Sequence, residues 1–170
     1  MQFNVAALLQ ERTGAIREYD IDDDIVIDGE QQHLSGHIRL DRTPRGVLAR
    51  ARLHGVTEAE CSRCLNPTTT PVEMLIEEEY IPLVDIHGGG RVDPIETETE
   101  NYRISERHVL DLSEAVRQYW AIALPLAPLC RGDCPGLCPH CGANLDETAH
   151  ACAAADLDSP WSKLRSLNLG

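Results

Sequence analysis

The chain has 170 residues, of which 42% are apolar and 25% are charged, a composition that excludes a wholly disordered chain. Its formal net charge of −13 disfavours binding to long stretches of nucleic acid, and an aromatic content of only 4% excludes a row of base-stacking side chains. No apolar run approaches the roughly 20 residues of a membrane span. Because Met1–Arg12 also lacks the pattern of a signal peptide, we expect a cytoplasmic protein.

Short strands are expected from the start of the chain to about residue 85. Apolar residues alternate with polar or small ones from Phe3 to Ala7, which predicts a first strand, and residues 15–21 predict a second. The aspartates between Asp20 and Asp24 then predict a charged turn.

A hairpin around Thr43–Gly46 is the clearest unit, because proline sets its bend and glycine closes it. A further strand over residues 72–80 places the Cys61–Cys64 pair at the tip of the next hairpin. This strand order predicts an antiparallel meander. The inner face of the first hairpin is expected to consist of Ile38, Leu40, Val47, Ala49, Ala51 and Leu53.

Residues 85–105 are rich in glycine and acids and predict a loop, followed by a helix that Asp111 opens with Glu114 in the capping-box position. The apolar face of that helix is expected to pack on the sheet. The sequence therefore predicts an α+β domain over residues 1–125, with an antiparallel β-meander sheet packed by one main helix. Residues 126–170 are expected to form a cysteine-rich, metal-binding zinc-knuckle segment that ends in a short helix.

The stretch from Arg39 to Arg63 is basic within an acidic chain, with six arginines against three acidic residues. In the predicted hairpin Arg39 faces Arg50 and His37 faces Arg52, and facing like charges lower stability unless an anion or an acidic neighbour offsets them. Two interpretations stay open. Either Arg39, Arg50, Arg52 and Arg63 bind a partner or RNA through its acidic groups or phosphates, or glutamates of the next strand neutralise a solvated face.

Seven cysteines in a chain expected to be cytoplasmic favour metal binding over disulfides, since cytoplasmic thiols stay reduced. In Cys138-Pro139-His140-Cys141-Gly142, two thiolates separated by two residues can bind one ion from a tight turn, and the glycine permits the left-handed conformation after it. Sulfur and imidazole together suit Zn²⁺. The expected ligands are Cys130, Cys134, Cys138, Cys141, His150 and Cys152, with Cys61 and Cys64 as further candidates.

The number of metal sites and the kind of metal stay open. One arrangement has two tetrahedral sites, the first formed by Cys61, Cys64, Cys130 and Cys134 and the second by Cys138, Cys141, His150 and Cys152. The other has a single site, with the remaining thiols buried as small apolar groups. An iron–sulfur cluster is the alternative cofactor, held by Cys130, Cys134, Cys138 and Cys141. No serine triad, phosphate loop or HExxH motif occurs, so no enzyme is expected.

Motifs along most of the chain occur in a recognisable combination. They include Arg42-Thr43-Pro44-x-Gly46-Val47-Leu48, Cys61-x-Arg63-Cys64-Leu65, Glu77-Glu78-Glu79-Tyr80, Leu124-Pro125-Leu126-x-Pro128-Leu129-Cys130 and Cys134-x-Gly136-Leu137-Cys138-Pro139-x-Cys141-Gly142-x-Asn144-Leu145. The combination resembles the YceD family, whose members are known as large ribosomal RNA subunit accumulation proteins. The family's usual return motif is Cys-x-Cys, which is His150-x-Cys152 in this chain.

The resemblance implies a factor that supports accumulation or processing of the large-subunit (23S) ribosomal RNA in ribosome biogenesis, stabilised by zinc. Because an acidic chain is an unfavourable RNA binder, we expect basic ribosomal or rRNA-processing proteins as partners, with limited rRNA contact at the arginines. No membrane or small-molecule ligand is expected. The competing functions are an iron–sulfur or thiol redox protein and a zinc-ribbon adaptor of another machine.

Overall fold

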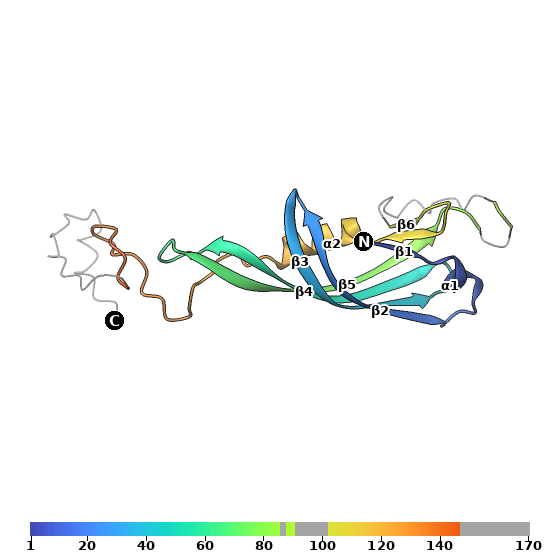
Figure 1. The fold of residues 1–170 in the computed structure, drawn as a ribbon, viewed down its shortest axis with the longest axis horizontal. Coiled ribbons are helices and arrows are strands. Elements are labelled where there is room, and N and C mark those ends of the chain that lie inside the picture. Colours follow the sequence, from blue (N-terminus) through green and yellow to red (C-terminus); the bar gives the residue numbers. More distant parts are fainter. Residues whose placement is uncertain (86–87, 91–101, 147–170) are drawn as a thin grey trace, which may run out of the picture. The chain divides into compact units, whose positions relative to one another are not determined.

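The computed structural model of the chain describes residues 1–85, 88–90 and 102–146. They form two compact units, one of residues 1–59 with 69–126 and one that combines residues 60–68 with the described residues from 127 on. The first unit contains a sheet and two helices (Figure 1), and the second contains loops rich in cysteine.

Seven strands form one sheet in the order β1-β7-β6-β5-β4-β3-β2. β6 runs parallel to β5, whereas β2, β3 and β4 pair antiparallel. The sheet is therefore mixed, and the expectation of a simple antiparallel meander is wrong for the whole sheet. The strands are Gln2–Asn4 (β1), Ile16–Ile27 (β2), Glu30–Arg42 (β3), Val47–Glu60 (β4), Pro67–Pro82 (β5), Arg103–Ile104 (β6) and Val109–Asp111 (β7).

The sheet curls strongly into half a barrel (Figure 1). The ring of Phe3 on β1, at one end of the strand order, lies 4.9 Å from the ring of Tyr19 on β2, at the other end. The side chains enclosed by this curl form the main core, which includes all six apolar residues predicted for the inner face of the first hairpin. The hairpin turn itself is confirmed, because the Thr43 backbone N–H donates to the carbonyl of Gly46 at 3.0 Å.

In the described part of the chain two helices accompany the sheet, α1 (Ala6–Gln10) and α2 (Ser113–Ala123), so the prediction of a single main helix is not confirmed. The apolar face of α2 is buried in the core, as predicted. Gly55 of β4 makes room for the ring of Trp120, because a Cβ at this glycine would lie 2.8 Å from Trp120 Cζ3. The fold is mostly β, and its two helices are short.

The prediction of a charged turn between Asp20 and Asp24 is wrong, because these aspartates lie inside β2 and pair with β3. The turn lies instead at Asp28-Gly29, where φ is 51° and 89°. Asp-Gly is the preferred sequence of a two-residue hairpin turn that requires positive φ at both positions. Inward-facing Tyr19 packs against the core, so Asp20, Asp22 and Asp24 occupy the outer face of an amphipathic strand.

The first predicted strand is too long, because β1 ends at Asn4 and Ala7 lies in α1. The Asn4 side chain accepts a hydrogen bond from the Ala6 backbone N–H at 3.1 Å, which favours the start of a helix there. The predicted loop over 85–105 is wrong at its end, where β6 begins at Arg103. Its residues 86–87 and 91–101, like the predicted C-terminal helix, lie outside the described residues.

The capping box predicted for the main helix is wrong. Asp111 ends β7, and its Oδ1 accepts a hydrogen bond from the Ser113 backbone N–H at 2.9 Å, just ahead of the helix. The Glu114 carboxylate accepts from Arg117 Nε at 3.0 Å instead of reaching back to the helix start. Among the described residues, no helix is both long and apolar enough to cross a membrane.

Candidate metal centre

Four thiols from two distant parts of the sequence meet in the second unit. Cys61 and Cys64 lie in the loop between β4 and β5, and Cys130 and Cys134 lie in the segment after α2. All four sulfur atoms lie within 4.8 Å of one another. The Sγ atoms of Cys61 and Cys134 are 3.9 Å apart, and those of Cys64 and Cys130 are 3.8 Å apart. We call these four residues the thiol cluster.

The spacing of the thiol cluster fits a single tetrahedral ion. Zinc–sulfur bonds of about 2.3 Å place the sulfur atoms of a tetrahedron about 3.8 Å apart. Three of the thiols are buried and Cys130 is exposed. The three buried thiols form a small apolar cluster with Leu129 packed against it. Four thiols are a soft ligand set that suits zinc.

The loop 61–66 folds into a knuckle that places its two thiols side by side. The Leu65 backbone N–H donates to the carbonyl of Cys61 at 2.9 Å, and the Cys61 N–H donates to the carbonyl of Asn66 at 2.9 Å. This tight reversal requires a left-handed residue after the second cysteine, and Leu65 adopts φ of 62° there. Glycine is the residue that usually marks a left-handed position in a sequence, so a leucine at this position gives no sign of the tight turn.

Backbone hydrogen bonds hold the two halves of the thiol cluster together. The Ser62 N–H donates to the carbonyl of Pro128 at 2.8 Å. Arg63 spans both halves, because its Nη1 donates to the carbonyl of Cys134 at 3.0 Å and its own carbonyl accepts from the Leu137 N–H at 3.1 Å. The Arg63 side chain, predicted to bind a partner or RNA, is therefore engaged beside the thiol cluster.

The thiols of the cluster differ in how readily they ionise. Backbone N–H groups of Cys130, Cys64 and Arg63 lower the pKa of Cys61 to about 6. The neighbouring thiol of Cys134, together with desolvation, raises the pKa of Cys130 to about 12. The pKa of Cys61 is therefore lowered while desolvation and neighbouring thiols raise those of Cys64 and Cys130. A bound cation favours the thiolate form of each of its ligands.

Cys138 and Cys141 do not belong to the thiol cluster, although Cys138 follows Cys134 by four residues. The iron–sulfur alternative required Cys130, Cys134, Cys138 and Cys141 in one place, and that set is not the one the described structure brings together. The remaining predicted ligands, His150 and Cys152, lie outside the described residues.

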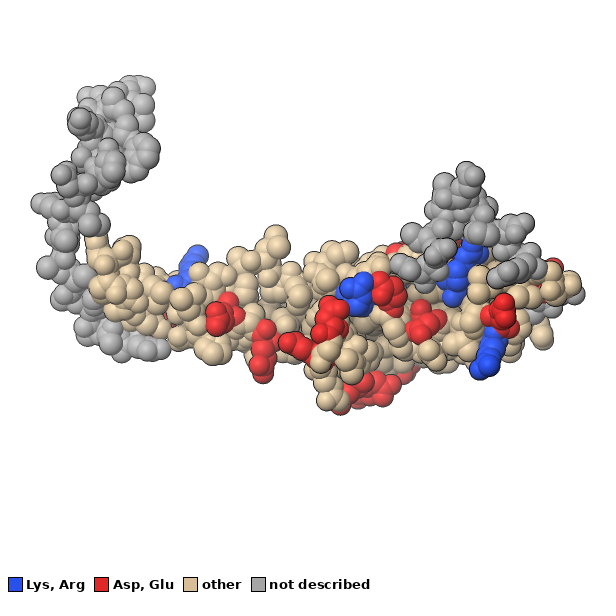
Figure 2. All heavy atoms as spheres, turned by 90° about the horizontal axis from the view of Figure 1, so that it is seen from above, with Lys and Arg blue, Asp and Glu red and all other residues tan. Residues whose placement is uncertain are grey.

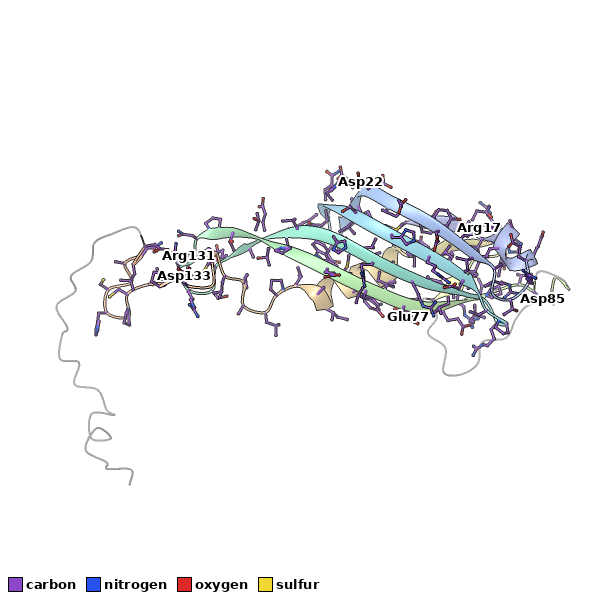
Figure 3. The ribbon with its side chains drawn as sticks, turned by 90° about the horizontal axis from the view of Figure 1, so that it is seen from below. Arg17, Asp22, Glu77, Asp85, Arg131 and Asp133 are labelled. Atoms are coloured by element: carbon purple, nitrogen blue, oxygen red, sulfur yellow. The ribbon has the colours of Figure 1, made fainter. Side chains whose placement is uncertain are left out.

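The predicted arginine pairs lie on the outer face of the first unit. Arg39 is opposite Arg50 and His37 is opposite Arg52, as the hairpin register predicts. Together with Leu75, Ile76 and Glu77 of β5 they line an open groove of about 390 Å³. Figure 3 views this face of the sheet, with Asp22 on β2 and Glu77 on β5 labelled.

Carboxylates from several strands neutralise these arginines. Asp41 of β3 accepts from both Arg39 Nε and Arg50 Nη1 at 2.9 Å. Arg50 Nε also donates to Glu77 of β5 at 3.2 Å, as the neutralised-face interpretation expected. Arg52 is the least tightly held, with Glu73 Oε1 at 3.9 Å from its Nε and an exposed side chain. Figure 2, which views the protein from the side opposite to Figure 3, shows acidic side chains together with a few basic ones there.

Comparisons with known proteins agree with the motifs. An uncharacterised protein of Mycobacterium bovis and one of Mycobacterium tuberculosis are each 31% identical over 128 residues, which is 75% of this chain and 58% of theirs. A Mycobacterium leprae protein is 28% identical over 131 residues, 76% of this chain and 57% of its own. The chain therefore spans little more than half the length of these relatives. No solved structure matches.

A family model described as "Large ribosomal RNA subunit accumulation protein YceD" matches residues 49–168. The matched range contains most of β4, all of β5 and α2, and every cysteine of the chain, so it includes both halves of the thiol cluster. On this match the chain belongs to the YceD family of large ribosomal RNA subunit accumulation proteins.

Proposed function

We propose that the protein supports accumulation of the large-subunit (23S) ribosomal RNA during ribosome biogenesis, as a cytoplasmic factor without catalytic activity. The observation that carries this proposal is the family match over residues 49–168. Support for a binding role rather than an enzymatic one comes from the thiol cluster, whose four sulfur atoms lie within 4.8 Å of one another and could hold one shared ion.

We propose Zn²⁺ as that ion, held by Cys61, Cys64, Cys130 and Cys134. Four thiolates suit zinc, and a closed four-ligand site is structural rather than catalytic. The ion would supply a crosslink between two loops that are about 70 residues apart in the sequence. Iron is the alternative metal, and elemental analysis of protein purified without added metal distinguishes the two.

The partners we propose are basic ribosomal or rRNA-processing proteins. The chain carries a net charge of −13, and the arginines of its outer sheet face are already paired with carboxylates. Such a surface attracts cationic partners and repels a phosphate backbone. Crosslinking in cells tests this order of preference: most crosslinks are expected to reach proteins, and a majority to rRNA would contradict it.

Limited rRNA contact is proposed at the outer groove, where Arg52 offers the most available guanidinium. The double variant Arg39→Glu with Arg50→Glu reverses the charge of the central pair at exposed positions. If the groove contacts RNA, this variant loses RNA crosslinks while it keeps its fold. Unchanged crosslinks at preserved folding end the groove proposal and leave the protein partners as the whole interaction.

A deletion strain tests the proposed function. We expect the ratio of 23S to 16S rRNA to fall in the strain and to recover with the wild-type gene. Cys64→Ser with Cys134→Ser removes one ligand from each half of the thiol cluster and is expected not to restore the ratio at equal protein level. Ser62→Ala, in the same loop but not a ligand, is the matched control and should restore it. An unchanged ratio in the deletion strain would contradict the function itself.

A further inference from the structure

β2 is a long strand at the edge of the sheet. The strand order ends at β2, and within the described part of the chain β2 pairs with β3 alone. Figure 3 shows Asp22 on this border strand. Near its start β2 approaches β1, where the rings of Tyr19 and Phe3 are in contact, so the open part of the edge is residues 20–26. An unpaired edge presents a row of backbone N–H and C=O groups that a further strand can join.

The register determines which residues present these backbone groups. In an antiparallel pair, residues that exchange hydrogen bonds with the neighbouring strand alternate with residues whose backbone groups point away from it. Just before β2, the Arg42 N–H donates to the carbonyl of Ala15 at 2.8 Å, and the pairing with β3 then continues without a bulge. The backbone groups of odd-numbered residues therefore point to β3. Those at the open edge belong to Asp20, Asp22, Asp24 and Val26.

The same residues carry exposed negative charge. The side chains of Asp20, Asp22 and Asp24 are 95%, 80% and 56% exposed. From Glu18 to Asp28, six of the eleven residues are acidic and none is basic. Unpaired backbone groups and carboxylates thus recur together at every second residue. We call residues 20–26 of β2 the acidic edge.

Imidazoles of β3 compensate only part of this charge. His33 lies between two carboxylates, with its Nδ1 2.9 Å from Asp24 Oδ1 and its Nε2 2.9 Å from Asp22 Oδ1. His37 Nδ1 lies 2.9 Å from Asp20 Oδ1. Even with both imidazoles protonated, the six acids of residues 18–28 outnumber these two cations. The acidic edge therefore attracts cationic groups.

We propose that the acidic edge is a docking surface for an extended, basic segment of a partner protein, which joins the sheet as an additional strand beside β2. Backbone hydrogen bonds supply the affinity, and lysine or arginine at every second position of the segment meets the aspartates. The same charge disfavours a second copy of this chain, because two acidic edges repel each other. The proposal rests on the basic partners of the proposed function and adds the surface and the conformation of their binding segment.

Binding of short peptides to the purified full chain tests the docking surface. The probe is a capped peptide of about seven residues, the length of the acidic edge, in which lysine alternates with threonine. A peptide of the same composition with all lysines at one end is the control. We expect the control to bind about 10-fold more weakly, because its charges cannot face successive aspartates in a paired strand. Failure of the alternating peptide to bind, or equal binding of both, would overturn the proposal.

Methylation of the peptide backbone separates strand pairing from charge attraction. One version of the alternating peptide is N-methylated at its lysines and another at its threonines. In a paired strand only one of these two sets donates to β2. We therefore expect one version to bind about 10-fold more weakly than the parent and the other to bind like it. Equal effects of the two methylations would show that no strand is added.

Asp22 allows a matched test on the protein itself. Its N–H points to the open edge, so Asp22→Pro removes a donor for the partner and none of the hydrogen bonds to β3. We expect this variant to keep its fold and to bind the alternating peptide more weakly than Asp22→Asn, which removes the charge alone. Glu73→Gln, at an exposed position of β5, is the control and should bind like the wild type. Equal binding by Asp22→Pro and the wild type would contradict pairing at the edge.

The edge and the proposed function can fail separately. Peptide binding uses purified protein without rRNA, whereas the 23S to 16S ratio of the deletion strain does not involve the edge. The methylated peptides also give an answer that does not depend on a variant folding. A dimer of the wild type that Asp22→Pro dissociates would assign the edge to a second copy of the chain and overturn the partner proposed here.

Discussion

Arg63 is the residue that joins the two loops of the thiol cluster, through its side chain to Cys134 and through its carbonyl to Leu137. Arg63→Ala removes a charged donor and is expected to weaken zinc retention about 10-fold, since a hydrogen bond of this kind contributes about 1.5 kcal/mol. Competition with a chromophoric chelator measures the loss. Arg107→Ala, an exposed arginine of the first unit, serves as control. Retention equal to that of the control would show that Arg63 is free for a partner.

Leu65 is strained by its left-handed backbone, which costs a residue with a Cβ roughly 1 kcal/mol. Leu65→Gly is therefore expected to leave stability unchanged or raise it by up to about 1 kcal/mol, because little burial is lost from a side chain that is 58% exposed. Leu75→Gly is the matched control, at 59% exposure but in the regular strand β5, and should lower stability by about 1 kcal/mol. The melting temperatures of the two zinc-loaded variants measure the difference. Equal destabilisation by Leu65→Gly and Leu75→Gly would contradict backbone strain at Leu65.

Among the elements, the β3–β4 pair depends on Asp41, whose side chain is only 15% exposed between the facing guanidinium groups of Arg39 and Arg50. Asp41→Asn leaves two like charges opposite each other and should lower the free energy of unfolding by about 1 to 2 kcal/mol. Urea unfolding at low and high salt measures this. The loss should shrink at high salt, which screens the repulsion. Asp20→Asn, at 95% exposure, is expected to change stability by less than about 0.5 kcal/mol.

The junction of β1, β7 and α2 depends on the Asp111 carboxylate. Desolvation raises its pKa, but hydrogen bonds from Ser113 and Gln2 outweigh that effect and lower the pKa to about 2. A carboxylate whose pKa is lower in the folded than in the unfolded state stabilises the fold at pH values above its unfolded pKa. The contribution of Asp111 is therefore complete at neutral pH and is lost as the pH falls from about 4 to about 2. Asp111→Asn should cost about 1 kcal/mol at pH 7, after allowance for its 43% exposure, and nothing near pH 2. A difference in melting temperature that persists at pH 2 would contradict this.

The elements also show where sequence reasoning is sufficient. The Thr43–Gly46 hairpin and its inner face follow from turn chemistry and alternation, which act locally. A run of acids is typical of a turn, so the aspartates of β2 led to a wrong prediction of a turn. The strand instead continues to the Asp28-Gly29 turn, and the inward Tyr19 anchors it to the core. The parallel pairing of β5 with β6 could not be predicted, because the glycine-rich, acidic sequence between them indicates a loop but not which strand follows it or how that strand pairs.

The same division applies to the candidate site. Counting ligands allows a set of Cys61, Cys64, Cys130 and Cys134, but equally allows several others, because spacing alone does not bring together residues about 70 positions apart. The sequence did not identify Asp41 as the counter-ion of the arginines for the same reason. Asp41 lies on the same strand as Arg39, but it neutralises the pair only because Arg50 of the neighbouring strand also reaches it.

At the scale of the whole molecule, we propose that one metal ion crosslinks the two loops of the second unit. The central claim is that the thiol cluster alone holds one ion. X-ray absorption at the zinc edge tests it on the full chain with Cys138→Ser, Cys141→Ser and Cys152→Ser, which retains only Cys61, Cys64, Cys130 and Cys134. We predict one zinc with four sulfur neighbours at about 2.3 Å. Nitrogen or oxygen neighbours in place of any sulfur would contradict the account.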